Sequence, residues 1–291
     1  MIFLKPKNLI QFFIQRSINI LFRFRISIKK KLHFKVRNNL FISGDFFESL
    51  SKINNVKKSS NVIFSTLENF PQKKDYSKLK NKIWIFHNSD KTFDLKKKKS
   101  LDLFKPKKCY SQNLTFKDRK YHFLPIGLEN DEYYNNGDIK DFLKLRKIEI
   151  NKTPRVLFGF NITNPKRVEI KKNLKLLDIA DETKGWNSYF YRRILLKYMF
   201  VICPEGNGID THRLWEALYL KTIPIMKKNK ISPFIQKINL PILVLNKWTD
   251  LLEYDEKKLK KLYSSKKNLF NNKYLFQNYW KRIITKEIDT I

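Results

Sequence analysis

Short apolar runs alternate with polar loops along the chain from residue 60 onward. Four such runs fall in the first half, at residues 61–69, 82–90, 107–114 and 121–130. Lysine- or aspartate-rich stretches separate them. Runs of this length, rich in β-branched and aromatic residues, are typical of buried strands in a parallel sheet. The lysine run at 96–99 is interpreted as a solvated surface loop.

The pattern resumes in the second half after a polar interval. Residues 131–153 carry only a short helical pattern, and Pro154 precedes a strand pattern at 155–164. Three more strands are predicted at 198–203, 222–226 and 241–245. Helices are predicted ahead of Asp181, at about 187–197, from Thr211 onward, at 233–237, and through most of the stretch after Trp248. This alternation predicts an α/β fold with parallel sheets and helices on both faces.

The length of 291 residues allows two domains of ordinary size. The polar interval places a boundary between them near residue 150. We therefore expect four parts: an N-terminal segment at 1–31, a first Rossmann-like domain at 32–150, a second one at 151–265, and a C-terminal helix at 266–291.

The N-terminal segment has the pattern of a basic amphipathic helix. Drawn as a helix, it gathers apolar residues opposite a polar stripe of Lys7, Gln11, Gln15, Asn19 and Arg23. Two hypotheses fit this pattern. The helix either lies on an anionic membrane surface or is the first helix of the fold, with its apolar side against the core.

Composition limits the class of protein. Hydrophobic residues make up 42% of the chain, which is ample for a packed core. The formal charge of +34 comes mostly from lysine and is spread along the whole chain, a pattern that codon bias toward A and T also produces. Specific nucleic-acid recognition is not expected, because no exposed aromatic platform or recognition helix is evident. Anionic partners in general are electrostatically favoured.

The two cysteines indicate the compartment. Cys109 and Cys203 are too few for a disulfide framework and lack the spacing of a metal site, so a reducing compartment is expected. No run of eighteen apolar residues occurs, so a membrane-spanning helix is not expected. We predict a cytoplasmic protein, peripheral at the inner face of a membrane if the N-terminal segment binds there.

A glycine-containing corner at 203–218, CPEGNGIDTHRLWEAL, carries the clearest chemistry. Two of the seven glycines stand there, between a predicted strand and a predicted helix. Backbone amides and the helix dipole at such a corner favour an anion. The candidate ligands of that anion are Glu205, Gly206, Asn207, Gly208, Asp210, Thr211, His212, Arg213 and Glu216. The alternative is a capped helix whose Arg213 and Glu216 form a surface ion pair.

Residues 204–226, PEGNGIDTHRLWEALYLKTIPIM, resemble the donor-binding signature of exostosin-like glycosyltransferases of the GT-B fold. Weaker similarity extends from about residue 80 to 250. The resemblance implies two Rossmann-like domains with parallel sheets facing across a cleft, and a nucleotide-sugar donor held mainly by the second domain. It implies a glycan or lipid-linked acceptor, no metal and no further cofactor. Arg213 would contact phosphate and Glu216 the ribose.

The sequence departs from the family pattern in two respects. Lys221 stands where the family usually has glycine, at a helix end where a left-handed residue favours glycine. The transmembrane anchor and stem of the eukaryotic relatives are missing, which favours an enzyme of bacterial or viral type.

Other predicted strand ends supply the opposite wall. Ligands bind beyond the carboxyl ends of parallel strands. In the second domain this rule adds four candidate donor-binding residues: Asn161, Thr163, Asn164 and Arg167. In the first domain Asp90, and after it His87, are candidates for the base that takes the acceptor proton. Glu68, Asn113 and Glu129 end neighbouring strands on the acceptor side.

These residues predict a glycosyltransferase, inverting in the first instance. The alternative hypothesis is a basic protein that binds a membrane surface or a polyanion and uses its Rossmann-like core without catalysis.

Overall fold

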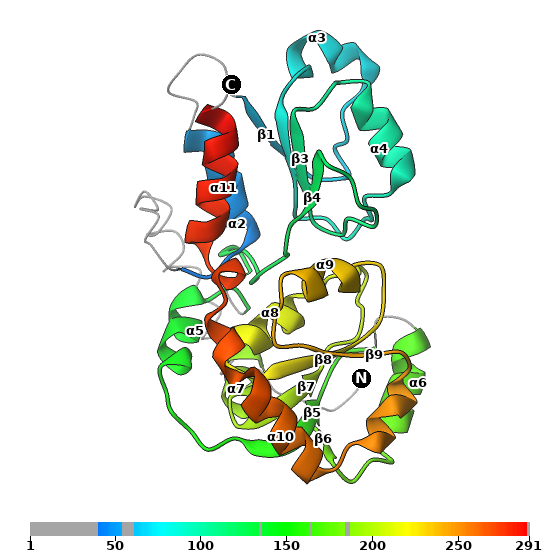
Figure 1. Ribbon diagram of the computed structural model, residues 1–291, viewed down its shortest axis with the longest axis vertical. Coiled ribbons are helices and arrows are strands. Elements are labelled where there is room, and N and C mark those ends of the chain that lie inside the picture. Colours follow the sequence, from blue (N-terminus) through cyan, green and yellow to red (C-terminus); the bar gives the residue numbers. More distant parts are fainter. Residues whose placement is uncertain (1–39, 54–60, 134–135, 163–164, 184–186, 290–291) are drawn as a thin grey trace, which may run out of the picture.

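Two parallel β-sheets, each with its own helices, form an upper and a lower lobe in Figure 1. This computed structural model describes residues 40–53, 61–133, 136–162, 165–183 and 187–289. Residues 1–31 lie outside this part, so the predicted amphipathic helix has no structural description.

The first lobe is built on a four-stranded sheet in the order β1-β2-β3-β4. Its strands are β1 (Val62–Ser65), β2 (Ile83–Phe86), β3 (Lys108–Ser111) and β4 (Tyr121–Phe123), all parallel. Its helices in the first part of the chain are α2 (Gly44–Ile53), η2 (Lys73–Asp75), α3 (Tyr76–Leu79) and α4 (Leu95–Asp102). All four strands fall inside the predicted runs.

Strand β2 shows why these runs become strands. Its four residues, IWIF, are all buried, because side chains cover both faces of the sheet. Trp84 and Phe86 stack on one face with ring centroids 5.4 Å apart. His87, the next residue, lies 5.1 Å from Phe47 of α2 on the other face.

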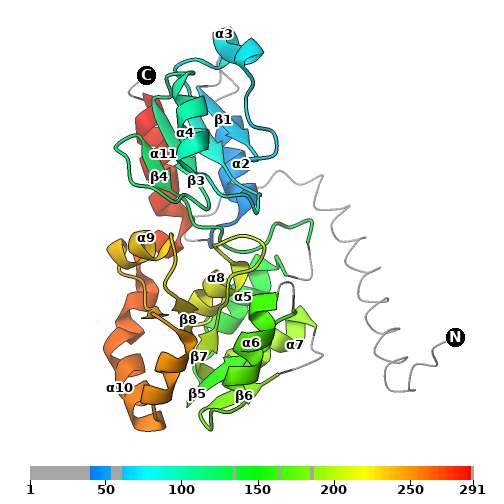
Figure 2. The ribbon, with the colours of Figure 1, turned by 90° about the vertical axis from the view of Figure 1, so that its right-hand side faces the viewer.

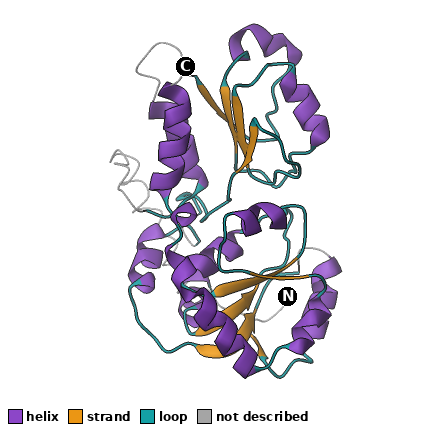
Figure 3. Cartoon of the chain, in the orientation of Figure 1, coloured by secondary structure: helices purple, strands orange, loops and turns teal. Residues whose placement is uncertain are grey.

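The second lobe is built on a five-stranded sheet in the order β6-β5-β7-β8-β9. Its strands are β5 (Thr153–Phe158), β6 (Ala180–Glu182), β7 (Tyr198–Ile202), β8 (Ile223–Lys227) and β9 (Leu243–Leu245), again all parallel. Helices lie on both sides of this sheet, as Figure 3 shows. The sequence therefore predicted the α/β class and the parallel sheets correctly.

The helices of the second half complete both lobes. In chain order they are α5 (Ile139–Arg146), α6 (Pro165–Leu174), α7 (Ser188–Leu195), α8 (His212–Tyr219), α9 (Ser232–Lys237), η3 (Trp248–Glu253), α10 (Glu256–Lys266), η4 (Lys267–Asn271), η5 (Lys273–Leu275) and α11 (Gln277–Asp289).

Helix α5 precedes the predicted boundary near residue 150 but packs with the second lobe. Arg146, its last residue, donates to the carbonyls of Tyr219 at 2.9 Å and Phe270 at 2.5 Å. These contacts tie α5 to α8 and to η4. The chain therefore enters the second lobe before β5 begins.

Helix α11 returns to the first lobe and lies beside α2 (Figure 1). The backbone amide and the side-chain amide of Gln277 donate to the carbonyls of Leu40 and Phe41, at 2.9 and 2.8 Å. Trp280 meets Phe47 edge-on, with ring centroids 6.2 Å apart. The end of the described chain thus closes the face of the first sheet that α2 begins to cover.

Two elements differ from the sequence predictions. The lysine run at 96–99 belongs to α4, because the Asp94 side chain caps the helix at Lys97 N, 2.9 Å away, and Leu101 anchors it. The edge strand β6 was not predicted, since its sequence ADE is polar and only half-buried. None of the helices that the structure describes is both long and apolar enough to cross a membrane.

We predict that Trp280→Ala lowers the free energy of unfolding by about 3–5 kcal/mol, as removal of a large buried aromatic side chain does. Trp280 is 5% exposed and is the main aromatic contact of α11 with α2. Urea unfolding followed by tryptophan fluorescence and circular dichroism measures the change. Leu252→Ala is the control, because Leu252 is 68% exposed and its loss should change stability by less than about 0.5 kcal/mol. Equal losses in the two variants would contradict the packing described here.

Candidate functional site

The glycine-containing corner lies where the two lobes meet. The order of the strands reverses at β5: β6 is added on one side of β5, and β7 to β9 are added on the other. Ligands of such sheets bind beyond the carboxyl ends of the strands at this point. The loop from β7 to α8 spans residues 203–211 and starts there. Residues that follow β2, β3 and β4 of the first lobe contact this loop and the first turn of α8.

Asp210 is a bracket between the lobes. One carboxylate oxygen accepts from the backbone amide of Ile126, after β4, at 2.8 Å. The other accepts from the Trp215 indole nitrogen and from the Thr211 amide, each at 2.9 Å. Burial raises the pKa of Asp210 to about 6, against these hydrogen bonds, which lower it. The sequence suggested that Asp210 holds the donor, but its oxygens are engaged by the protein itself.

Gly208 lies against side chains of the first lobe. A Cβ atom at this position would lie 3.1 Å from Asn113 Nδ2 and 3.3 Å from Asp90 Oδ1. Asn113 is buried, accepts from the amide of Asp210 at 2.9 Å and donates to Ser89 O at 3.1 Å. Glycine at 208 therefore serves the contact between lobes, and it sets the Asp90 carboxylate against the loop.

His212 forms a second bridge. Its Nδ1 lies 2.9 Å from the Gly127 carbonyl, and its Nε2 pairs with the Glu129 carboxylate. Burial alone would lower the pKa of His212, but the hydrogen bond to Glu129 and its charge outweigh this and raise it. His212 was predicted to bind the donor, but both of its ring nitrogens contact the first lobe.

Arg213 points to the opposite side of α8, toward the end of β5. Its guanidinium donates to the Gly159 carbonyl and stacks on Tyr191 of α7, 4.8 Å from the ring centroid. Neither Gly159 nor Tyr191 was among the sequence candidates, because nothing in their local pattern marks a partner of Arg213. The remaining guanidinium donors of Arg213 have no hydrogen-bond acceptor among the described residues.

Glu216 lies one turn further along α8. Within the described part of the chain no donor reaches its half-buried carboxylate. Burial raises the pKa of Glu216, and the positive charges of Arg213, His212 and Arg192 oppose this. A half-buried carboxylate beside these positive groups can accept hydrogen bonds from ligand hydroxyl groups.

Arg167, in the first turn of α6, binds backbone carbonyls of the loop between β7 and α8. It donates to the carbonyls of Glu205 at 2.9 Å, Asn161 at 2.8 Å and Pro204 at 3.3 Å. Burial and then the positive charge of Arg213 lower the pKa of Arg167. The two guanidinium groups are therefore close enough to repel, an arrangement that an anion between them would relieve.

The remaining candidate donor-binding residues differ in exposure and in the contacts they make. Glu205 and Asn207 are exposed, and Asn161 is exposed beside Arg167. Gly206 N donates to Gly208 O at 3.1 Å and shapes the loop. Thr211 is the N-cap of α8, and its side chain makes no cap hydrogen bond. Thr163 and Asn164 lie outside the described residues.

The two candidate bases differ in access. Asp90 is exposed and faces Gly208. His87 is fully buried, with its ring nitrogens against Asn88 Oδ1 at 2.8 Å and the Pro125 carbonyl at 3.2 Å. Burial lowers the pKa of His87 to about 4, so the ring is neutral, but it has no open nitrogen. The geometry favours Asp90 over His87.

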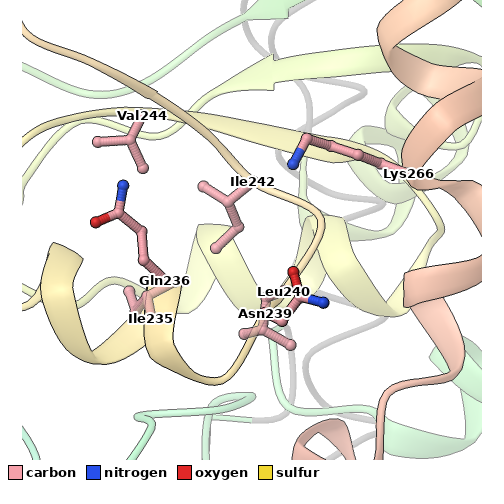
Figure 4. Close-up of a pocket in the computed structure, with 7 residues that line it drawn as sticks. All are labelled: Ile235, Gln236, Asn239, Leu240, Ile242, Val244 and Lys266. Atoms are coloured by element: carbon pink, nitrogen blue, oxygen red, sulfur yellow. The ribbon is translucent and has the colours of Figure 1, made fainter.

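Two cavities lie away from this site. One, of about 180 Å³, is lined from α9, the segment that leads into β9, and α10, by Ile235, Gln236, Ile242 and Lys266 among others (Figure 4). It is smaller than typical ligand pockets, which start near 300 Å³. The other, of about 370 Å³, lies beside β1 and Trp84. Among the described residues, no cluster of three or more His, Cys, Asp or Glu side chains could hold a metal ion.

Lys221, which stands where exostosin-like enzymes usually have glycine, has the backbone conformation expected at this helix end. It follows α8 with φ 55°, a left-handed conformation that favours glycine. Its carbonyl accepts from the Tyr263 hydroxyl at 2.8 Å, which holds the turn.

Comparison with known proteins adds no relative: no protein-family model matches the chain, and no curated protein matches it.

We predict that wild type loses stability relative to Asp210→Asn as pH rises from 4 to 7. The folded chain keeps the Asp210 proton up to about pH 6, whereas the unfolded chain releases it near 4, so unfolding releases a proton in this window. The free energy of unfolding of wild type should fall by about 2–3 kcal/mol relative to that of the variant. Urea unfolding at several pH values tests this. A constant difference between the two proteins would exclude the raised pKa.

Proposed function

We propose that the protein is a GT-B-type glycosyltransferase that moves a sugar from a nucleotide-sugar donor to a hydroxyl group of a glycan or lipid-linked acceptor. The observation that carries the proposal is the position of the Asp90 carboxylate over Gly208, in the loop that leads to Arg213 and Glu216. A base of one lobe thereby faces an anion-binding corner of the other. The resemblance of residues 204–226 to exostosin-like enzymes supports the same function.

The donor would be held by the second lobe. Arg213 has unused guanidinium donors for diphosphate oxygens, and Arg167 adds positive charge beside it. The N-terminus of α8 adds the positive end of the helix dipole. Glu216, whose carboxylate has no donor among the described residues, would accept from the ribose hydroxyls.

In the proposed transfer, Asp90 takes the proton of the acceptor hydroxyl. The acceptor oxygen attacks the anomeric carbon as the bond from that carbon to the diphosphate oxygen breaks, and the diphosphate leaves with the electron pair. Arg213, with Arg167 behind it, meets the growing negative charge, so the protein's own cations take the role that a metal has in other transferases. Attack opposite the leaving group inverts the anomeric configuration.

We predict that a nucleoside diphosphate raises the melting temperature of wild type and not that of Arg213→Ala. UDP and GDP are the probes. At a concentration of 100 Kd the stabilisation is about 2.7 kcal/mol, or a shift of roughly 5–10 °C for a chain of this size. Arg119→Ala is the control, because it removes one exposed arginine from the first lobe. If no nucleoside diphosphate shifts wild type, the alternative of a non-catalytic binding protein is favoured.

We predict that Asp90→Asn lowers the transfer rate by at least about 100-fold while the shift with nucleoside diphosphate stays. The amide keeps the shape of the side chain but takes no proton. Asp178→Asn, at an exposed aspartate of the second lobe, should transfer at the wild-type rate. The readout is release of nucleoside diphosphate in the presence of candidate donors and acceptors. An unchanged rate in Asp90→Asn would remove Asp90 as the base without touching the donor site.

A further inference from the structure

Exposed apolar side chains gather on two helices that lie in different lobes. Twelve large apolar side chains are exposed among the described residues, and five of them are on or beside α4 and α6. Single exposed apolar residues are normal, but several on one side of the molecule together with lysines are typical of an interaction surface.

Helix α4 presents leucine and lysine together. Leu95 is 59% exposed and Leu103, directly after the helix, is 53% exposed. Leu101 is buried and anchors the opposite side. Lys96 and Lys99 are exposed, and the helical spacing puts both on the outer side with the two leucines.

Helix α6 repeats this arrangement in the second lobe. Val168 is 51% exposed and Leu176, two residues after the helix, is 78% exposed. The buried Ile170 and Leu174 face the other way, toward the sheet. Lys172 is exposed on the same outer side as Val168.

The two helices lie on the same side of the molecule. Both stand at the right-hand edge of Figure 1, α4 above and α6 below, and both face the viewer in Figure 2. A flat partner could therefore touch both lobes at once.

We propose that α4 and α6 form a docking surface for a lipid bilayer that contains anionic phospholipids. Leucine and valine would enter the boundary between headgroups and acyl chains, and the lysines would extend to the phosphates. A nucleic acid would use the lysines but has no use for exposed leucines on the same stripe. The proposal holds whether or not the protein is a transferase.

The first test compares two fourfold variants of the full chain on vesicles of phosphatidylcholine and phosphatidylglycerol in equal parts. The surface variant carries Lys99→Glu, Leu103→Gln, Lys172→Glu and Leu176→Gln. The control carries Lys144→Glu, Lys147→Glu, Ile148→Gln and Ile150→Gln. Its positions are exposed on or just after α5, at the left-hand edge of Figure 1. Both variants replace two lysines with glutamate and two exposed aliphatic side chains with glutamine, so total charge cannot separate them.

We predict that the surface variant partitions onto the vesicles at least about tenfold more weakly than wild type, and that the control partitions like wild type. Equal partitioning of the surface variant and wild type would overturn the proposal, as would an equal loss in the control. Two twofold variants divide the surface variant into its lysine changes (Lys99→Glu, Lys172→Glu) and its leucine changes (Leu103→Gln, Leu176→Gln). Weaker partitioning of the lysine variant with no effect in the leucine variant would also overturn the proposal and indicate a general polyanion surface.

A second measurement needs no loss of binding. Both native cysteines, Cys109 and Cys203, are buried, so a new surface cysteine can be labelled selectively with an environment-sensitive dye. Leu103→Cys and Leu176→Cys should both show a blue shift and brighter emission on the anionic vesicles, and Ile148→Cys should not. A response at only one of the first two positions would contradict a surface that spans both lobes.

Discussion

The buried carboxylate of Asp210 is the interaction on which the arrangement of the lobes depends. It binds the Ile126 amide of the first lobe and, in the second, the Trp215 indole and the Thr211 amide. Removing the Asp210 carboxylate would leave its three buried donors without an acceptor, at a cost of about 1–3 kcal/mol each. The start of α8 and the segment after β4 of the first lobe therefore meet at one group, and the bridges from His212 and Asn113 add to this contact.

Close approach follows from this bracket. Asn113 contacts the Asp210 amide from the first lobe, and Gly208 leaves room for Asn113 and Asp90 to reach the loop. A Cβ atom at 208 would require the side chains of Asn113 and Asp90 to shift by a few tenths of an ångström. The glycine that the sequence linked to anion binding thus acts first on the junction.

Local patterns predicted what is determined locally. The apolar runs gave the strands of both sheets because buried parallel strands need such runs, whereas the polar edge strand β6 and the lysine-rich α4 gave no such signal. The contacts between the lobes could not be predicted from the sequence for a different reason. Asp210 meets Ile126 across 84 positions of the chain, and His212 meets Gly127 across 85. Nothing near Asp210 distinguishes a bracket from a ligand, so position alone suggested that it binds the donor.

Charge accounts for what remains open at the corner. Asp210 and the pair of His212 with Glu129 are engaged between the lobes, which leaves Arg167, Arg213 and Glu216 on the side of β5. These three residues together carry one net positive charge when Glu216 is ionised. Arg167 satisfies much of its hydrogen bonding on backbone carbonyls, while Arg213 and Glu216 keep donors and acceptors unused among the described residues. A ligand with both anionic oxygens and neutral hydroxyl groups matches this pair better than a simple anion, because a simple anion would leave the Glu216 carboxylate without a donor.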